Sequence, residues 1–533
     1  ARTCTGPVAG APGPAHFLTR RRKAAKGSWR EIKPSVEPAG GRSSCLKLES
    51  SVSPILVVAW WQWFLVLFEI GVGGGAMVHV ILRKRDPRAA AYWIAIILLV
   101  PLAGAALYLL LGINLIRRRA RFYREATAPA YSAAAPDAGA AEGLEPEPEI
   151  LAMGPLLDGL RRLSRLAVTC GNAVEILRNG DEAMPAMIGA IDRARESVCL
   201  GTYIFELQGI GSKFVAALER AKARGVEVRV MIDDAGTRYA WPPVTRELKR
   251  LGVRVARFMP NRFVLRLLSM NMRNHRKILV VDGREGFTGG MNIRQGNMLR
   301  ENPPYPVQDL HCRVTGPVVA EMQRMFAEDW LFCTGEKLTG SRWYPDLVPV
   351  GDVCALGIPD GPDEDLGVAA AALAVALASA SQEVRIVTPY FLPTPQLLYG
   401  LIACGLRGLD VKIIVPSENN ISVIKWATQT MYAPLLEHGV RIFEQAPPFD
   451  HSKIFTVDGK WSCIGSTNWD PRSLRLNFEF DVACFDEVLA RDLNREFERK
   501  LAVSTEVTRA MLDRQSLPVR LRNGTARLFI PLL

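Results

Sequence analysis

Two long apolar segments lie near the start of the chain, and each is long enough to be a membrane helix. The first covers residues 54–82 and the second residues 91–113. Because a helix needs about 20 apolar residues to cross a bilayer, each segment predicts one transmembrane helix. A short basic turn at 83–88 separates them, so the pattern predicts a membrane hairpin over residues 53–116.

The segments on either side of this hairpin lack an apolar pattern of their own. Residues 1–52 are rich in Gly, Pro, Ser and Arg, which predicts a disordered or non-native extension. Residues 117–149 start with a cluster of arginines and become rich in Ala, Pro and Glu, which predicts a flexible linker. Basic residues are more numerous on the terminal sides of the hairpin than in its turn. This distribution favours both termini, and the body that follows, in the cytosol.

Beyond the linker, short β-branched runs alternate with helical stretches, and the order repeats. The first half predicts helix, strand, helix and strand at 184–195, 198–205, 212–223 and 224–233. The second half predicts the same order at 368–380, 384–390, 394–406 and 407–416. Gly225 and Gly408 occupy matching positions and are predicted to end their helices as left-handed caps. The repeat predicts two α/β halves related by a pseudo-two-fold axis, over residues 150–340 and 341–533, each with a parallel or mixed sheet.

Each half contains one copy of the same polar pattern, H-x-K-x4-D-x6-G-x2-N, without a gap. The first copy consists of His275, Lys277, Asp282, Gly289 and Asn292. The second copy consists of His451, Lys453, Asp458, Gly465 and Asn468. Because the chain has only six histidines, chance is a poor explanation for two of them at matching points.

The residue types in this pattern suit reactions at a phosphate group. Histidine can attack or transfer a proton near neutral pH, lysine is a compact positive charge, and asparagine donates amide N–H groups. A histidine and a lysine two positions apart in a strand point to the same face. Two copies that face each other would therefore surround one phosphodiester with a nucleophile, an acid and two positive charges.

The doubled motif resembles the HKD signature of the phospholipase D superfamily. The sequence around it is similar to that of bacterial cardiolipin synthases with an N-terminal membrane hairpin. The similar stretches are residues 83–88, 274–282 and 465–479. The resemblance covers roughly residues 54 to 533. It implies a bilobal phospholipase D-like fold of two pseudo-two-fold-related α/β halves, preceded by two transmembrane helices.

The resemblance also implies roles for the motif residues. His275 would attack phosphorus and form a phosphohistidine, and His451 would act as acid and base. Phosphoryl oxygens would be held by Lys277, Lys453, Asn292, Asn468 and Ser466. Asp282 and Asp458 complete the catalytic motif, although their position five residues past each lysine favours a structural role. In the first copy, Gly290 stands where the family often has serine.

Two further carboxylates are candidates for orienting the imidazoles. Asp309 lies 34 residues after His275, and Glu479 lies 28 residues after His451. Similar family positions carry a carboxylate that fixes the histidine tautomer. Tyr203 and Tyr390 end equivalent strands, where they either line the mouth of the site or pack in the core.

The activity implied is a cardiolipin synthase, which transfers a phosphatidyl group between two phosphatidylglycerols and releases glycerol. The alternatives are a phospholipase D-type hydrolase or a phosphatidyltransferase with another acceptor alcohol. The expected partner is anionic phospholipid in the cytoplasmic membrane, with no nucleic acid, and the net charge of +12 agrees with an anionic partner. The ten cysteines show no metal-ligand spacing and are expected to be reduced, so no metal or other cofactor is implied.

Overall fold

The computed structural model describes residues 54–84, 87–112, 153–164, 166–239, 241–260, 272–361 and 365–528. The predicted extension at 1–52 and linker at 117–149 lie outside these residues. The first element is α1 (Pro54–Arg83), a helix of 30 residues. Within the part of the chain that the structure describes, its stretch Trp60–Arg83 is the only helix long and apolar enough to cross a membrane.

The second apolar segment forms shorter helical pieces instead of one continuous membrane helix. These pieces are α2 (Pro87–Leu99), α3 (Pro101–Leu107) and the π-helical turn η1 (Tyr108–Gly112). The break follows from Pro101, since the residue before a proline avoids the helical conformation, and Val100 is non-helical with φ −142° and ψ 80°. The chain then turns back, and a Cβ atom at Gly104 would lie only 2.7 Å from the carbonyl oxygen of Ile96. Glycine therefore permits the close approach of α3 to α2.

A small apolar cluster joins these helices to the end of α1. Ala76 and Val80 of α1 pack with Ile97 of α2 and with Ala105 and Tyr108. The Tyr108 hydroxyl also lies 2.8 Å from Nδ1 of His79, which gives the polar His79 side chain a partner in a mainly apolar helix.

The two predicted halves join edge to edge in one mixed sheet of 15 strands. From the outer edge inward, the first half contributes β4 (Arg254–Phe258), β3 (Glu227–Asp233), β2 (Ser197–Thr202), β5 (Ile278–Val281), β6 (Glu285–Gly289), β8 (Leu310–Thr315) and β1 (Thr169–Arg178). The second half contributes, in the same order, β12 (Arg441–Gln445), β11 (Asp410–Pro416), β10 (Glu383–Val387), β14 (Ile454–Val457), β15 (Trp461–Gly465), β16 (Glu479–Phe485) and β9 (Val353–Asp360). Strand β17 (Ser504–Glu506) extends the second series beyond β12. The series match strand for strand about the antiparallel β1–β9 pair, as the internal repeat predicts.

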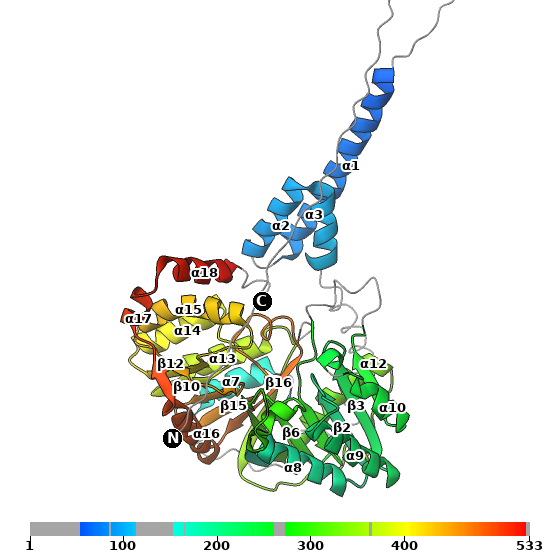
Figure 1. The fold of residues 1–533 in the computed structure, drawn as a ribbon, viewed down its shortest axis with the longest axis vertical. Helices are drawn as coiled ribbons and strands as arrows, with labels where there is room; N and C mark the ends of the chain where they lie inside the picture. The colour runs from blue at the N-terminus through cyan, green and yellow to red at the C-terminus, as the bar shows by residue number, and fades with distance from the viewer. Residues whose placement is uncertain are drawn as a thin grey trace, which may run out of the picture. The chain divides into compact units, whose positions relative to one another are not determined.

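Helices cover both faces of the sheet (Figure 1). In the first half these are α8 (Asn179–Arg193), α9 (Ile210–Ala223), α10 (Val244–Arg250) and α12 (Val319–Thr334). In the second half they are α13 (Val368–Ser379), α14 (Pro395–Leu406), α15 (Ser422–Leu436) and α16 (Glu487–Leu501). The apolar run of β5 is explained by this arrangement, because Ile278 and Val280 belong to the core under α12 while Leu279 and Val281 belong to the core under α8 and α9.

The shorter elements complete the chain. They are α7 (Gly154–Leu163), η2 (Gly236–Tyr239), η3 (Gln295–Asn297), η4 (Leu299–Glu301), β7 (Val307–Gln308), β13 (Phe449–Asp450), α17 (Arg509–Asp513) and α18 (Leu517–Leu528). The predicted glycine caps are confirmed, since Gly225 after α9 has φ +88° and Gly408 after α14 has φ +79°.

Two cysteines at the junction of the halves form a disulfide. Cys170 lies on β1 and Cys354 on the adjacent β9, and their sulfur atoms are bonded. The expectation that every cysteine is reduced is therefore wrong for this pair, because strand pairing brings together residues 184 positions apart.

Candidate active site

Each motif histidine lies in a short extended segment just before β5 or β14, clamped to the other half of the protein. The backbone N–H of His275 donates to the carbonyl of Phe478 at 2.9 Å. The N–H of His451 donates to the carbonyl of Gln308 at 2.8 Å. Each clamping residue is followed directly by a predicted orienting carboxylate, either Glu479 or Asp309. The backbone alone therefore brings a carboxylate of one half next to the histidine of the other.

The side chains also pair across the two halves, with each histidine bonded to the carboxylate of the other half. Nδ1 of His275 lies 2.9 Å from Oε2 of Glu479, and Nδ1 of His451 lies 2.8 Å from Oδ2 of Asp309. Both carboxylates are almost fully buried, while each imidazole keeps 12% of its surface exposed. Because an ionised carboxylate only accepts hydrogen bonds, each Nδ1 carries the proton and each Nε2 keeps its lone pair. The structure thus gives both histidines the tautomer that a nucleophile or base needs.

The motif lysines curl back beside their histidines. Nζ of Lys277 donates to the carbonyl of His275 at 2.5 Å, and Nζ of Lys453 makes the same bond to His451. Lys453 also lies 3.0 Å from Nδ1 of the His451 ring. Two ammonium groups that are nearly buried therefore lie beside two imidazoles, which is a setting for an anionic group.

Tyrosines flank both histidines at equivalent positions. The ring of Tyr203, just after β2, lies 5.6 Å from the ring of His275. The ring of Tyr390, which follows β10, lies 6.1 Å from that of His451. Both tyrosines are half-buried, so of the two roles predicted for them the structure supports the lining of the site.

Comparison with known proteins agrees with this geometry. A family model described as "Cardiolipin synthase, PLD-like domain" matches residues 187–330 and 373–501, one segment in each half. A second model, described as "Phospholipase_D-nuclease N-terminal", matches residues 75–112. A cardiolipin synthase of Geobacillus thermodenitrificans is 30% identical over 479 residues, which cover 88% of this chain and 94% of that protein. The chain belongs to the cardiolipin synthase family.

Other similar proteins extend the comparison. Cardiolipin synthase A of Pseudomonas fluorescens is 31% identical over 475 residues, covering 87% of this chain and 96% of that protein. A cardiolipin synthase of Oceanobacillus iheyensis is 29% identical over 463 residues, covering 86% and 96%. Among solved structures, phosphatidylserine synthase of Haemophilus influenzae superposes with a TM-score of 0.53 at 14% identity, covering 71% of this chain and all of that one. This last likeness supports the phospholipase D-like α/β fold.

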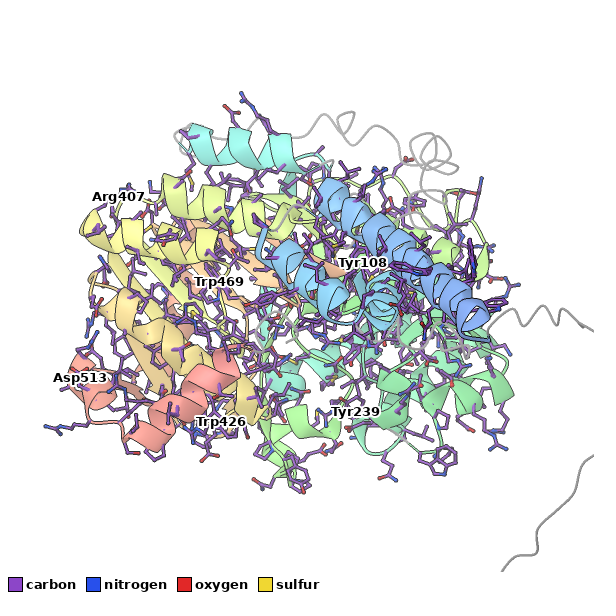
Figure 2. All side chains as sticks on the ribbon, turned by 90° about the horizontal axis from the view of Figure 1, so that it is seen from above. Tyr108, Tyr239, Arg407, Trp426, Trp469 and Asp513 are labelled. Carbon is purple, nitrogen blue, oxygen red and sulfur yellow. A yellow bond between two sulfur atoms is a disulfide. The ribbon has the colours of Figure 1, made fainter. Side chains whose placement is uncertain are left out.

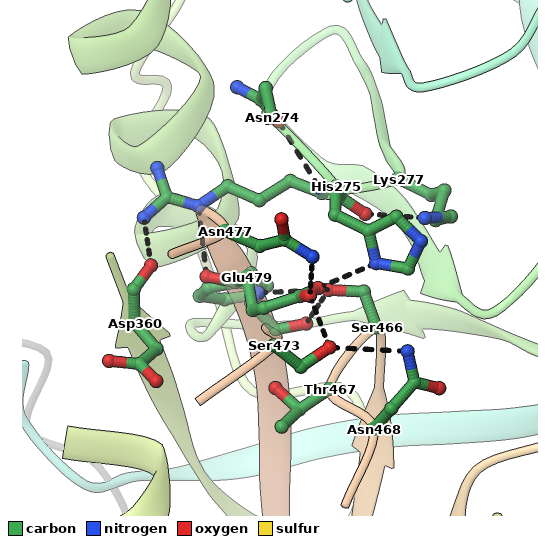
Figure 3. A network of polar contacts seen from close by, with 12 residues as sticks. Asn274, His275, Lys277, Asp360, Ser466, Thr467, Asn468, Ser473, Asn477 and Glu479 are labelled. Atoms are coloured by element: carbon green, nitrogen blue, oxygen red, sulfur yellow. Dashed lines mark hydrogen bonds and ion pairs between the residues drawn. The ribbon is translucent and has the colours of Figure 1, made fainter. Parts of the chain in front are cut away.

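In this member of the cardiolipin synthase family, Glu479 lies at the centre of a buried polar network (Figure 3). Its Oε2 accepts from the Ser466 hydroxyl at 2.5 Å, and its Oε1 accepts from Ser473 at 2.8 Å and Asn477 at 3.0 Å. Ser466 also accepts from the backbone N–H of Phe480. Ser466 is predicted to bind phosphate, and in the structure its hydroxyl is fully buried and donates to Glu479. Sequence analysis missed Ser473 and Asn477, although both lie within the 465–479 stretch that carries the family resemblance.

Gly290 is the first-half equivalent of Ser466, and the carboxylate beside it belongs to Asp309, whose side chain is shorter than that of Glu479. A Cβ atom at Gly290 would lie 2.2 Å from Oδ1 of Asp309. Asp309 therefore occupies the space where a side chain at position 290 would be. The second half pairs serine with the longer glutamate, and the first half pairs glycine with the shorter aspartate.

The motif aspartates lie at the opposite ends of β5 and β14 from the lysines. The carboxylate of Asp282 accepts from the backbone N–H groups of Arg195, Glu196 and Ser197, just before β2. The carboxylate of Asp458 accepts from the equivalent N–H groups of residues 381–383, before β10. This placement supports the structural role that their spacing favours over a direct part in the chemistry.

The motif asparagines keep amide hydrogens for a ligand. Oδ1 of Asn292 accepts from the N–H of Ile204 at 3.0 Å, which leaves its amide nitrogen free to donate. Nδ2 of Asn468 donates one hydrogen to Ser473 at 3.1 Å and retains a second. Both remain predicted phosphate ligands.

A buried ion pair supports each histidine segment, and sequence analysis did not identify either pair. In the first half, Arg276 binds Asp329 of α12 at 2.8 Å and donates to the backbone carbonyl of Glu479. In the second half, Asp450 binds Lys500 of α16 at 2.6 Å. These pairs fix the segments that flank His275 and His451, respectively.

Burial and the clustered charges determine the ionisation of the site. Burial lowers the pKa of His451 to about 4, with Lys453 adding to the shift, and it also lowers the pKa of His275. Burial lowers the pKa of Lys277 to about 7 and lowers that of Lys453 as well. Burial alone would raise the pKa of Glu479, but His275, Lys277 and Ser466 outweigh it and bring the pKa to about 2. At neutral pH the protein's own groups therefore give a site with neutral imidazoles and an ionised Glu479.

We expect kcat/KM for a monomeric phosphodiester lipid, which already declines as His451 loses its proton, to fall more steeply above about pH 7. The phosphate-binding role predicted for Lys277 requires its charged form, which is present below its pKa of about 7 and lost above it. The pH profile of kcat/KM reports groups of the free enzyme. The Lys277→Arg variant, whose guanidinium stays charged, should lose the alkaline limb in whatever activity it retains. A limb unchanged by this substitution would contradict the assignment.

Removing the buried cation Lys500 is expected to destabilise the second half. Lys500→Met leaves the Asp450 carboxylate buried without a counter-ion, which costs about 3–5 kcal/mol of unfolding free energy. Lys460→Met serves as a control, because the Lys460–Glu487 pair is exposed and contributes about 0–1 kcal/mol. Urea unfolding in detergent, followed by tryptophan fluorescence, measures both. Equal shifts in the two variants would show that the buried pair has no special role.

Proposed function

We propose that this chain is a membrane-bound cardiolipin synthase that transfers a phosphatidyl group from one phosphatidylglycerol to another and releases glycerol. The observation that carries the proposal is the pair of histidines, each bonded through Nδ1 to a buried carboxylate and each beside a lysine. Such a site suits a two-step transfer at phosphorus. Relatives named cardiolipin synthases that match over nearly their whole length support a phospholipid substrate.

In the first step, the Nε2 lone pair of His275 attacks phosphorus of the bound phosphatidylglycerol. The bond from phosphorus to the glycerol oxygen breaks, and this oxygen takes a proton from His451. The anionic phosphodiester offsets the lysine charges, which favours the protonated form of His451 that this step requires. Lys277 and Lys453 stabilise the negative charge on the phosphoryl oxygens in the transition state. The product is a phosphatidyl group bonded to His275.

In the second step, the hydroxyl of another phosphatidylglycerol gives its proton to His451 and attacks the same phosphorus. The phosphorus–nitrogen bond breaks, and its electron pair returns to His275. Cardiolipin leaves, and His451 is again protonated for the next cycle. The residues balance every proton and electron pair in this sequence without another group.

A membrane anchor accounts for the N-terminal helix. The stretch Trp60–Arg83 has 24 residues, and a helix of this length spans roughly 36 Å, more than the hydrocarbon core of a bilayer. The folded-back pair α2 and α3 would lie beside it as a second apolar element. Anchoring the chain in this way keeps the catalytic halves close to their lipid substrate.

Lipid mass spectrometry of the purified protein tests the function. Given phosphatidylglycerol in mixed micelles, the protein is expected to form cardiolipin and glycerol in equal amounts. Both products should disappear in His275→Ala and His451→Ala. Phosphatidic acid without cardiolipin would contradict the transferase and establish the hydrolase. Adding phosphatidylethanolamine with labelled acyl chains shows which lipid supplies each half of the product.

A further inference from the structure

The C-terminal helix α18 exposes an apolar stripe of three leucines. Leu517, Leu521 and Leu528 are 67%, 61% and 73% exposed. Their spacing of four and seven residues places them on one face of the helix. Asn523 and Ala526 are buried on the other face. Single exposed leucines are ordinary on protein surfaces, but three in register on one short helix form an apolar face that no other described residue covers.

The charged residues around this stripe indicate the kind of surface that would cover it. Residues 514–533 contain no aspartate or glutamate, and their four arginines are Arg514, Arg520, Arg522 and Arg527. The three arginines on α18 are exposed beside the leucines. A helix with an apolar face flanked only by arginines is typical of helices that lie on anionic membranes.

The packing of α18 places it on the wall of the active site. Ala526 shares a buried cluster with Leu392 and with Ile424 of α15, and Tyr390 packs against the same cluster. The guanidinium of Arg522 lies 4.8 Å from the ring of Trp426 on α15, and Figure 2 shows Trp426 beside the red C-terminal helix. Tyr390 also flanks His451, so the cluster that contains Tyr390 and Ala526 forms a wall of the site. Helix α18 lies on the outer side of this wall, and Tyr390 lies on the side that faces His451.

Exposed aromatic residues form the corresponding rim on the first half. Tyr239, labelled in Figure 2, ends η2 after β3 and is 59% exposed, and Trp241, two residues further on, is 91% exposed. The first residue of η2, Gly236, lies so close to the backbone carbonyl of Tyr203 that a Cβ atom would not fit, so η2 lies against a tyrosine that lines the site. Tyrosine and tryptophan are the side chains preferred at the membrane–water interface.

We propose that α18, together with Tyr239 and Trp241, forms a second membrane-docking surface that seats the mouth of the site on an anionic lipid leaflet. This surface is separate from the N-terminal anchor. The anchor holds the chain at the membrane, whereas the rim sets the orientation in which lipid headgroups reach the histidines. The occupant is the lipid surface itself, recognised by apolar insertion and by arginine contacts with anionic headgroups.

Photo-crosslinking of the full chain tests the contact directly. With p-benzoylphenylalanine at position 521, the protein in nanodiscs of phosphatidylglycerol is expected to form lipid adducts about tenfold more than with the same residue at 488. Val488 is a matched control, since it is 61% exposed on α16, at the opposite end of the second half (Figure 1). Equal lipid adducts at both positions, or capture of protein at position 521, would overturn the proposal.

A kinetic comparison tests the consequence for catalysis. The Leu517→Ser, Leu521→Ser, Leu528→Ser triple variant is expected to act about tenfold more slowly on phosphatidylglycerol in vesicles and unchanged on monomeric dihexanoyl phosphatidylglycerol. A matched triple variant at exposed Leu406, Val488 and Val503 should be normal on both substrates. Equal loss on both substrates, or no loss on vesicles, would overturn the docking role. If the unaltered protein made no cardiolipin, the proposed function would fail, while the crosslinking result would still decide the docking surface.

Discussion

A His451→Ala variant is expected to release one equivalent of p-nitrophenolate from a phosphatidyl ester of p-nitrophenol and then to stall. This leaving group needs no proton, so His275 can still attack phosphorus without the acid. The second step then lacks its base, and the phosphatidyl group stays on His275. Steady-state turnover of phosphatidylglycerol should fall by about 10⁴-fold or more. Rapid-mixing absorbance measures the burst, and mass spectrometry of the digested protein locates the adduct.

The control variants make the assignment of the nucleophile decisive. His275→Ala should show neither burst nor adduct, because it lacks the attacking nitrogen. His438→Ala should retain full turnover, since the His438 ring bonds to the carbonyl of Pro434 outside the site. A burst in His275→Ala, with the adduct on His451, would reverse the two roles.

The exchanged carboxylates predict an unusual pattern of defects. Glu479→Gln, in the second half, is expected to slow the burst by about 10²–10⁴-fold, because an amide facing Nδ1 favours the wrong tautomer of His275. Asp309→Asn, in the first half, should leave the burst intact and slow turnover, because it acts on His451. Burst and steady-state rates measured on the same samples give both values.

A purely structural role for these carboxylates would give another result. Loss of folding would reduce the burst amplitude in both variants, whereas loss of orientation reduces the burst rate in Glu479→Gln alone. Ser473→Ala removes one of the supports of Glu479 and should show a weaker form of the same defect. If Asp309→Asn slowed the burst and Glu479→Gln did not, the exchange between halves would play no part in the chemistry.

Much of this site can be predicted from sequence because its signals are local. The spacing of His275 and Lys277 predicts that they share a strand face, and the glycines at 225 and 408 predict helix ends that the structure confirms. The two orienting carboxylates were also predicted. Their exchange was not, since it depends on how β-segments far apart in the chain pair across the junction of the halves.

Other features depend on contacts that no local pattern records. The role of Ser466 follows from the reach of Glu479, and the disulfide follows from the pairing of β1 with β9. Arg276 resembles any exposed basic residue in the sequence, yet it is buried and pairs with Asp329, 53 positions away. The break at Pro101 was overlooked because hydropathy alone measures length and not backbone geometry.

The crossing of the two carboxylates has a consequence for how this chain can change over evolutionary time. Each half holds the histidine of one dyad and the carboxylate of the other. Neither half can therefore accumulate substitutions at these positions independently of the other half. A substitution at Asp309 would be selected against through the failure of His451, which is encoded far downstream. The two halves must therefore be inherited together. If they were encoded by separate genes, the histidine and the carboxylate of each dyad would lie on different chains.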